Sequence, residues 1–168
     1  MGETEESVLI AASVAEVWAI YFEPRTWPTW VDGFGGVDDS EGYPGEGATL
    51  RWHSTPAGRG RVVERVLEHV PRTRHRVAFS DDASEGELTT TFEVASGGEG
   101  GEPATRVTQA LGYSLRRAGA LSSVTDYLFV RPQMQRSLGR SLERLRREVN
   151  DLAAAGDDQQ GAPADGAV

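Results

Sequence analysis

The stretch from Arg136 to Leu152 constrains the fold most, because it carries one apolar stripe at helical spacing. Leucine or valine recurs every three or four residues, and arginine and glutamate fill the positions between, with the stripe at Leu138, Leu142, Leu145, Val149 and Leu152. This spacing predicts a long amphipathic helix with a single buried face. Such a helix needs a broad apolar surface to cover, and the chain before it must supply that surface.

Length and composition place the chain among ordinary globular proteins. Its 168 residues are 38% hydrophobic and 26% charged, which predicts one domain with a substantial core. We assign the domain to residues 1–155 and expect residues 156–168 to form a disordered tail, because they are rich in Asp, Gln, Gly, Ala and Pro. No apolar run is long enough for a membrane span and no signal pattern opens the chain, so we expect a cytoplasmic protein.

The residue inventory excludes several kinds of chemistry. The chain has no cysteine, which excludes disulfides, thiol nucleophiles and thiolate metal sites. All 17 basic residues are arginine, so no lysine is available for a Schiff base. The net charge of −9 argues against a nucleic-acid partner. The three histidines, His53, His69 and His75, are predicted to point outward or lie in turns, and they show no metal-ligand spacing.

The first part of the chain predicts a strand and two short helices. Ser7–Ala11 is a plausible strand, and Ser13 with Glu16 fits a capping box at the start of a helix that Pro24 ends. The segment Arg25–Trp30 predicts a second short helix or turn. A further strand and a loose turn are expected between Val31 and Gly47.

From residue 48 to residue 116 the sequence predicts antiparallel strands joined by turns. The expected strands are 48–54, 61–70, 75–81, 85–95 and 105–116. The turn positions predict that Trp52 lies opposite Val62 and that Val66 lies opposite Phe79. They also place Phe79 near Leu88. These pairings put the apolar residues on one face, as expected for an antiparallel sheet with one solvated side.

The predicted inner face can be written out from these registers. It consists of Leu50, Trp52, Val62, Glu64, Val66, Val77, Phe79, Leu88, Thr90, Phe92, Val94, Val107, Gln109, Leu111, Tyr113 and Leu115. In the long helical region, Pro132 should kink or break the helix near Arg131. Side chains before that point, including Leu128, would then cap a cavity between the sheet and the helix.

The order of elements resembles a known superfamily, and four stretches carry the resemblance. Val8–Trp18 is similar to its I-x-A-P/S-x-x-x-V-W opening, and Trp27–Trp30 to its W-P-x-W segment. Val66–Pro71 resembles V-x-E-x-x-P, and Thr105–Thr108 resembles G-T-x-V-T without its glycine. These are features of the START-like, or SRPBCC, helix-grip superfamily and its polyketide cyclase/dehydrase-like branch. The resemblance implies an α+β fold with a curved antiparallel sheet of six to seven strands and a long C-terminal helix.

Glu64 is the main candidate for chemistry on the inner face. The register points it inward, with Asp81 as an approximate neighbour on the next strand. Two nearby carboxyl groups among apolar walls cannot both ionise easily, so one would hold its proton and exchange it with a carbonyl or enol. The alternative is that Asp81 lies in water at the strand end and Glu64 pairs with an arginine.

The other candidates are polar or aromatic residues that face the expected cavity. Tyr113 is a second catalytic candidate, because its hydroxyl needs a partner inside the sheet. The expected ligand-binding residues are Trp30, Trp52, Phe79, Thr90, Phe92, Gln109 and Leu128. Most of the apolar ones have packing as their alternative role.

The resemblance implies three possible functions. The first is a cofactor-free polyketide cyclase, aromatase or dehydratase that binds a hydrophobic, polyketide-like small molecule. The second is a ligand carrier or sensor without chemistry, and the third is a protein-interaction module of the chaperone-activator kind. We expect no cofactor and no metal, and either a monomer or a homodimer.

Overall fold

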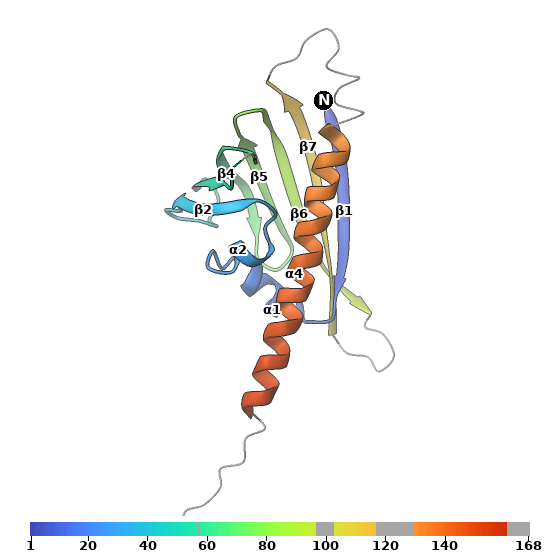
Figure 1. Ribbon diagram of the computed structural model, residues 1–168. Helices are drawn as coiled ribbons and strands as arrows, with labels where there is room; N and C mark the ends of the chain where they lie inside the picture. Colours follow the sequence, from blue (N-terminus) through green and yellow to red (C-terminus); the bar gives the residue numbers. More distant parts are fainter. Residues whose placement is uncertain (57, 97–102, 117–129, 161–168) are drawn as a thin grey trace, which may run out of the picture.

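Seven antiparallel strands form one curved sheet in the order β1-β7-β6-β5-β4-β3-β2, and one long helix lies across its concave face (Figure 1). This computed structural model describes residues 1–56, 58–96, 103–116 and 130–160. Its elements are β1 (Gly2–Ile10), α1 (Val14–Tyr21), α2 (Trp27–Trp30), β2 (Phe34–Asp39), β3 (Thr49–Ser54), β4 (Arg61–Val70), β5 (Arg74–Ser80), β6 (Ser84–Ser96), β7 (Pro103–Leu115) and α4 (Arg131–Gln160). The helix-grip fold expected from the sequence is confirmed.

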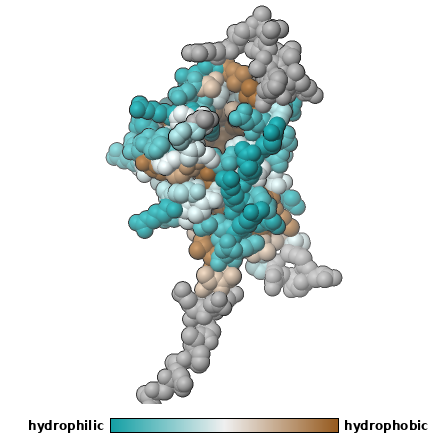
Figure 2. Space-filling view, in the orientation of Figure 1, coloured by the Kyte–Doolittle hydropathy of each residue, from teal (hydrophilic) through white to brown (hydrophobic). Residues whose placement is uncertain are grey.

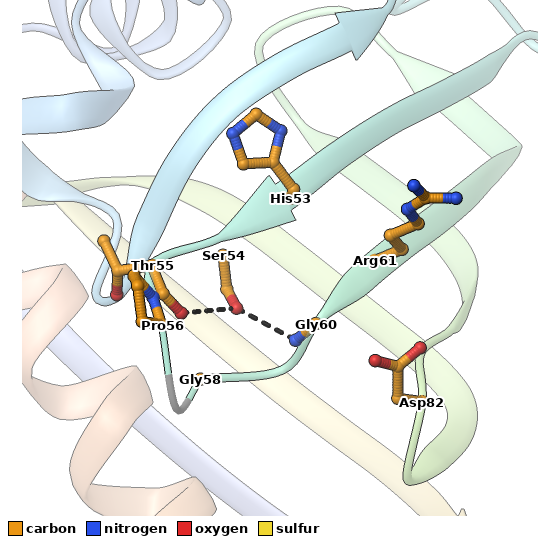
Figure 3. A pocket seen from close by; sticks show the side chains of 8 residues that line it. All are labelled: His53, Ser54, Thr55, Pro56, Gly58, Gly60, Arg61 and Asp82. Atoms are coloured by element: carbon orange, nitrogen blue, oxygen red, sulfur yellow. Dashed lines mark hydrogen bonds between the residues drawn. The ribbon is translucent and has the colours of Figure 1, made fainter.

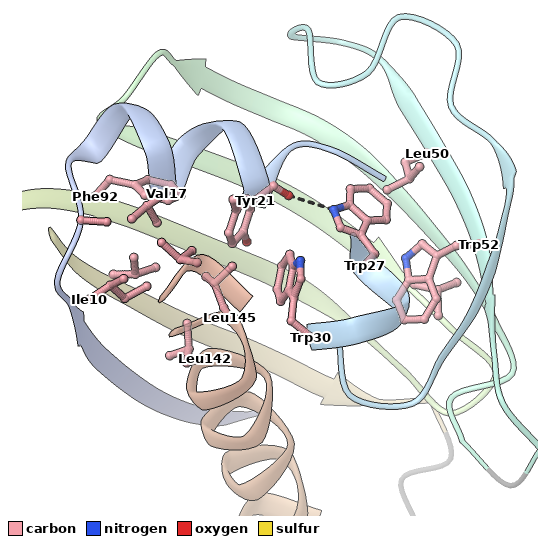
Figure 4. Close-up of a cluster of buried hydrophobic side chains, with 14 residues drawn as sticks. Ile10, Val17, Tyr21, Trp27, Trp30, Leu50, Trp52, Phe92, Leu142 and Leu145 are labelled. Carbon is pink, nitrogen blue, oxygen red and sulfur yellow. Dashed lines mark hydrogen bonds between the residues drawn. The ribbon is translucent and has the colours of Figure 1, made fainter. Parts of the chain in front are cut away.

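The apolar stripe of α4 forms the contact between helix and sheet. Leu142, Leu145 and Val149 are buried in one cluster with Ile10 of β1 and Phe92 of β6. Figure 4 shows the two leucines pointing into this cluster. The stripe ends before Leu152, which is 47% exposed, because α4 runs past the end of the sheet there (Figure 1).

The two ends of α4 bear on two sequence predictions. The helix begins at Arg131 with Pro132 in its first turn, where a missing backbone N–H leaves no intrahelical hydrogen bond unmade. Leu128 and the rest of the predicted cavity cap lie outside the described residues. At the other end α4 continues to Gln160, so it extends into the segment predicted to be a tail. No helix within the described ranges is long and apolar enough to cross a membrane.

The two short helices fold as predicted and close one end of the sheet. The Ser13 hydroxyl accepts from the Glu16 backbone N–H, while the Glu16 carboxylate accepts from the Ser13 backbone N–H, which completes the capping box. The Trp27 indole N–H then donates to the Tyr21 carbonyl oxygen at 2.8 Å (Figure 4). This bond fixes α2 against the end of α1 and carries Trp30 toward α4.

The predicted registers need correction on both sides of β5. Trp52 pairs with Val62 as predicted, but Val66 pairs with Val77, and Phe79 pairs with Glu64. Phe79 also lies opposite Gly86 rather than Leu88. Between β4 and β5 the turn is one residue tighter than predicted, and the bulge between Val66 and Glu68 adds a second residue. Between β5 and β6 a tighter turn around Asp81 displaces the partners by two residues. A shift of two keeps every side chain on its predicted face, so Val66 and Phe79 are still buried.

Two residues differ from the sequence prediction in their exposure. Val94 is 85% exposed, because β6 extends beyond the part of the sheet that the helices cover. His75, predicted to be outward, is buried at 4% exposure beside the rings of Phe22 and Tyr43. Its Nδ1 lies 3.0 Å from Nδ1 of His69, so one of these two nitrogens donates and the other accepts.

The buried histidine should make stability depend on pH. Burial lowers the pKa of His75 to about 4, with a further contribution from His69, so the folded protein holds the ring neutral. In the unfolded chain its pKa is about 6.5. Above about pH 6.5 the ring is neutral in both states, so the protein has its full stability. As the pH falls toward 4 the unfolded chain takes up a proton that the folded protein excludes, and the free energy of unfolding falls by roughly 3 kcal/mol.

Urea unfolding between about pH 7.5 and pH 4 tests this expectation in wild type and His75→Phe. On acidification the stability difference should change by roughly 3 kcal/mol in favour of His75→Phe, because only the unfolded wild-type chain takes up a proton at position 75 that its folded state excludes. His53→Phe is the control, since His53 is exposed and solvent reaches its ring in the folded state. If the stability of wild type and His75→Phe falls in parallel with pH, His75 is not the buried ring that makes stability depend on pH.

Candidate functional site

A cavity lies between α2, the inner face of the sheet and α4. Its volume is about 120 Å³. Trp27, Trp30, Phe34 and Trp52 supply a largely aromatic wall, and Leu138 closes the side toward α4. The remaining lining residues are Tyr21, Val31, Asp32, Tyr43, Leu50, Arg59, Glu64, Leu88, Gln109, Ser137 and Ser141.

Glu64 projects from β4 into this cavity and is held by one neighbour. The Trp52 indole N–H donates to Glu64 Oε1 at 3.0 Å from the adjacent strand. Burial raises the pKa of the Glu64 carboxyl above its ordinary value, although the Trp52 hydrogen bond and the charge of Arg59 offset part of the rise. The carboxyl group therefore keeps its proton to a higher pH than an exposed glutamate does.

A buried hydrogen-bond chain forms a second part of the cavity wall. The Gln109 amide donates from Nε2 to the Tyr21 hydroxyl at 3.0 Å, and the Tyr21 hydroxyl lies 2.9 Å from Thr90 Oγ1. The other amide atom, Gln109 Oε1, is buried and has no hydrogen-bond partner among the described residues. An unsatisfied buried acceptor is uncommon, and a ligand or water with a donor group would satisfy it.

The two tyrosines of the cavity differ in their hydrogen bonding. Burial raises the pKa of Tyr21 to about 12, so its hydroxyl stays neutral and can donate to Thr90. Burial also raises the pKa of Tyr43 well above its ordinary value, and the nearby Glu64 charge adds to the effect. No described residue forms a hydrogen bond with the Tyr43 hydroxyl, which therefore remains a donor for a ligand.

Asp81 forms an ion pair at the edge of the cavity. Its carboxylate is buried and accepts from Arg59 Nε at 2.8 Å and from the backbone and hydroxyl of Ser84. Burial alone would raise the pKa of Asp81, but the Arg59 charge and these hydrogen bonds outweigh it and hold that pKa below its usual range. Asp81 therefore does not pair with Glu64 as predicted, because its partner is Arg59. The raised pKa of Glu64 comes from burial and not from a second carboxylate.

Asp32 joins the loop after α2 to α4 beside the cavity. Its carboxylate accepts from the Arg140 guanidinium at 2.7 Å and from the Ser137 hydroxyl at 2.9 Å. The Arg140 hydrogen bond is the largest reason that the pKa of Asp32 lies below its ordinary value. The Asp32 backbone N–H also donates to Ser141 Oγ at 2.9 Å. These contacts hold the loop after α2, which forms one wall of the cavity, against α4.

The structure brings together some of the residues that the sequence nominated. Glu64, Trp30, Trp52 and Gln109 line the cavity. Four others lie outside its lining: Phe79, Thr90, Phe92 and Tyr113. Thr90 is one hydrogen bond away through Tyr21, and Phe92 packs on Trp18 and Tyr21. Tyr113 is buried with Phe79 and Leu111 in a separate cluster, and Leu128 lies outside the described residues.

Several residues of the cavity were not expected from the sequence, and Tyr21, Tyr43 and Arg59 are the three that bear on its chemistry. Tyr21 lies at the end of α1, and the signal that could have identified it is that a buried tyrosine needs a partner for its hydroxyl. Tyr43 and Arg59 lie in Gly-rich connections outside the strands, where no periodicity shows which way a side chain points. Only the fold of these two connections places them against the cavity.

A larger hollow of about 620 Å³ lies at the hairpin between β3 and β4 (Figure 3). Ser54 Oγ organises this loop by accepting from the Gly60 backbone N–H at 2.9 Å and donating to the Thr55 carbonyl oxygen at 3.0 Å. The charged side chains around it, His53, Arg61 and Asp82, are exposed. This hollow presents solvated groups and no buried carboxyl. The cavity under α4 is therefore the better candidate for ligand chemistry. Figure 2 shows hydrophilic residues along the outward face of α4, which covers that cavity.

Comparisons with known proteins agree with the observed fold. The family model described as polyketide cyclase/dehydrase and lipid transport matches residues 1–150. A protein from Thermus thermophilus has a similar structure with a TM-score of 0.70 at 22% identity, covering 91% of this chain and 99% of its own. Norcoclaurine synthase from Thalictrum flavum gives 0.63 at 14% identity, covering 88% and 92%. No curated protein sequence matches the chain well enough to count as a relative.

The hydrogen-bond chain predicts different outcomes for two tyrosine substitutions. Tyr21→Phe leaves the Gln109 amide and the Thr90 hydroxyl without their shared partner, so we expect a loss of about 1–3 kcal/mol in the free energy of unfolding. Tyr43→Phe removes a hydroxyl with no partner among the described residues, so its expected change is within about 0.5 kcal/mol. Urea unfolding of both variants measures these changes in the free energy of unfolding. Equal losses would show that the Gln109–Tyr21–Thr90 hydrogen bonds do not stabilise the fold more than an unpaired hydroxyl does.

Proposed function

Because the chain belongs to the polyketide cyclase/dehydrase and lipid transport family, we propose that it binds a hydrophobic small molecule in the cavity under α4 and acts on it as a cyclase- or dehydratase-like enzyme without a cofactor. The observation that carries this proposal is Glu64, a carboxyl group of raised pKa set in an aromatic cavity wall. A proton-exchanging group in such a position is typical of functional sites.

The cavity walls favour a flat, mostly apolar ligand. Aromatic side chains dominate the lining, and they gain most from offset or edge contacts with another ring. An apolar cavity of about 150 Å³ binds benzene, so a volume of about 120 Å³ suits roughly one six-membered ring or an equivalent folded segment. For a polyketide-like substrate, that segment would be the part where a ring closes or water is lost.

The polar groups could position such a segment and exchange protons with it. The free acceptor Gln109 Oε1 suits a ligand hydroxyl, and the Tyr43 hydroxyl suits a ligand carbonyl. Glu64 in its protonated form would donate its proton to the carbonyl oxygen while a water molecule takes the proton from the neighbouring C–H group, and the electron pair of the broken C–H bond forms the C=C bond of the enol that aldol chemistry needs. Tyr113 has no part in this proposal, because it lies in a separate buried cluster.

Hydrogen–deuterium exchange at the methyl group of acetophenone tests the acid role of Glu64. Acetophenone carries one ring and one ketone, and its methyl protons exchange through the enol. We expect the wild type to accelerate exchange above buffer, and Glu64→Gln to lower the acceleration by about 100-fold or more. Binding, measured by ligand-observed NMR, should stay within a few fold, since the glutamine oxygen still accepts from Trp52.

Glu68→Gln is the control, because it removes a carboxylate of the same strand that pairs with Arg74 instead of lining the cavity. It should leave the exchange rate unchanged. Exchange that is equal in wild type and Glu64→Gln would remove Glu64 from the chemistry and favour a carrier or sensor, a function that the family's lipid-transport members suggest. A cavity that takes up no probe would leave the interaction-module alternative.

A further inference from the structure

Arg59 lies at the boundary between the cavity and the Asp81 loop. It is the one cation among the described residues that line the cavity. Its guanidinium carbon lies 4.7 Å from the centroid of the Phe79 ring and 5.7 Å from that of Trp52. These distances are typical of a cation held over aromatic faces. The side chain is therefore held in place, yet it is still 33% exposed.

Most of the hydrogen-bonding capacity of Arg59 is unused. A guanidinium has five N–H donors, and here Nε donates to Asp81 Oδ2 at 2.8 Å. No described residue accepts a hydrogen bond from its two terminal nitrogens. Arg140, the arginine of the Asp32 contact beside the cavity, differs in that both Nε and a terminal nitrogen bind the carboxylate.

Asp81 fixes the guanidinium without covering its outer edge. The Asp81 carboxylate is only 2% exposed and also accepts from the Ala83 and Ser84 backbone N–H groups. It is therefore bound to its own loop and reaches Arg59 through one nitrogen. The result is a planar donor that is oriented in advance, which is the arrangement that binds carboxylates with two parallel hydrogen bonds.

The other acidic groups of the cavity leave room for a ligand anion. Asp32 is neutralised by Arg140 and Arg144 on the α4 side. Glu64 is the second acidic group, and burial raises the pKa of its carboxyl, which favours the uncharged form beside a ligand anion. Among the described residues that line the cavity, the terminal nitrogens of Arg59 are thus the only cationic donors without a protein acceptor.

We propose that the cavity is selective for organic acids, and that the terminal nitrogens of Arg59 bind the carboxylate of a compact aromatic or polyketide-derived acid. This inference rests on the proposed small-molecule function and names the class of ligand. A neutral carbonyl could accept from the same nitrogens, but it would lack the charge that strengthens these hydrogen bonds. Selectivity for the charged form over a neutral analogue of the same shape is therefore the distinguishing property.

Three single-ring probes separate this inference from the proposed function: benzoate, benzamide and acetophenone. Binding is measured by titration at neutral pH, following the tryptophan indole signals in ¹H–¹⁵N NMR spectra, because Trp27, Trp30 and Trp52 line the cavity. Benzoate should bind about tenfold more tightly than benzamide. Arg59→Gln should reduce this preference to within about threefold, and Arg59→Lys should give an intermediate preference, because lysine keeps the charge without the planar fork.

Arg61→Gln is the matched control. It makes the same change in net charge two residues along the hairpin, but Arg61 is exposed and does not line the cavity. It should keep the full preference for benzoate. The wild-type comparison of benzoate with benzamide does not depend on any variant, so it remains decisive if Arg59→Gln unfolds after losing the Asp81 ion pair.

The outcomes are distinct. Binding of acetophenone with equal affinities for benzoate and benzamide would overturn acid selectivity and leave the proposed small-molecule function standing. A benzoate preference that survives in Arg59→Gln, or that disappears in Arg61→Gln, would show that Arg59 is not the anchor. If none of the three probes shifts an indole signal, the proposed function fails and the ligand class fails with it.

Discussion

The contact between the apolar stripe of α4 and the inner face of the sheet is the interaction on which the rest of the structure depends. Leu142, Leu145 and Val149 are almost completely buried there, and burial of each such side chain contributes about 1.5–3 kcal/mol. The stripe is narrow, however, and the sheet is broad. Where α4 meets the β1 side of the sheet the packing is closed. Toward α2 and β3 a cavity of about 120 Å³ remains.

Because α4 covers only part of the sheet, the polar groups around this cavity are neither fully solvated nor fully paired within the protein. Each is at least partly withdrawn from water but has fewer partners than it can use: Glu64 has one hydrogen bond from Trp52, Gln109 has a free carbonyl oxygen, and Arg59 donates through one nitrogen. A tightly packed interior would leave no such groups, and a solvated cleft would satisfy them with water. This arrangement is the basis on which we propose a ligand with complementary donors, acceptors and charge.

The sequence was informative wherever side chains repeat with a fixed period. The stripe of α4 and the alternation along β3 to β7 were enough to predict the fold and the faces. They did not fix the pairing of β5, because tighter turns at its two ends and the bulge after Val66 move its partners by two residues at Val66 and Phe79, which keeps these side chains on their faces. The site was predicted less completely. Glu64, Trp52 and Gln109 lie on strands and could be identified, whereas Tyr43 and Arg59 lie in irregular connections whose course no pattern reveals.

The claim that the cavity holds a small hydrophobic molecule is tested most directly by locating a bound probe. Acetophenone can be added to ¹³C,¹⁵N-labelled protein, and filtered NOE spectra then record which protein protons lie next to the unlabelled probe. We expect contacts to the indole protons of Trp30 and Trp52 and to the Leu138 methyl groups, which line the cavity from α2, β3 and α4. Contacts confined to the outer face of the sheet, or no contacts at all, would contradict a ligand site under α4.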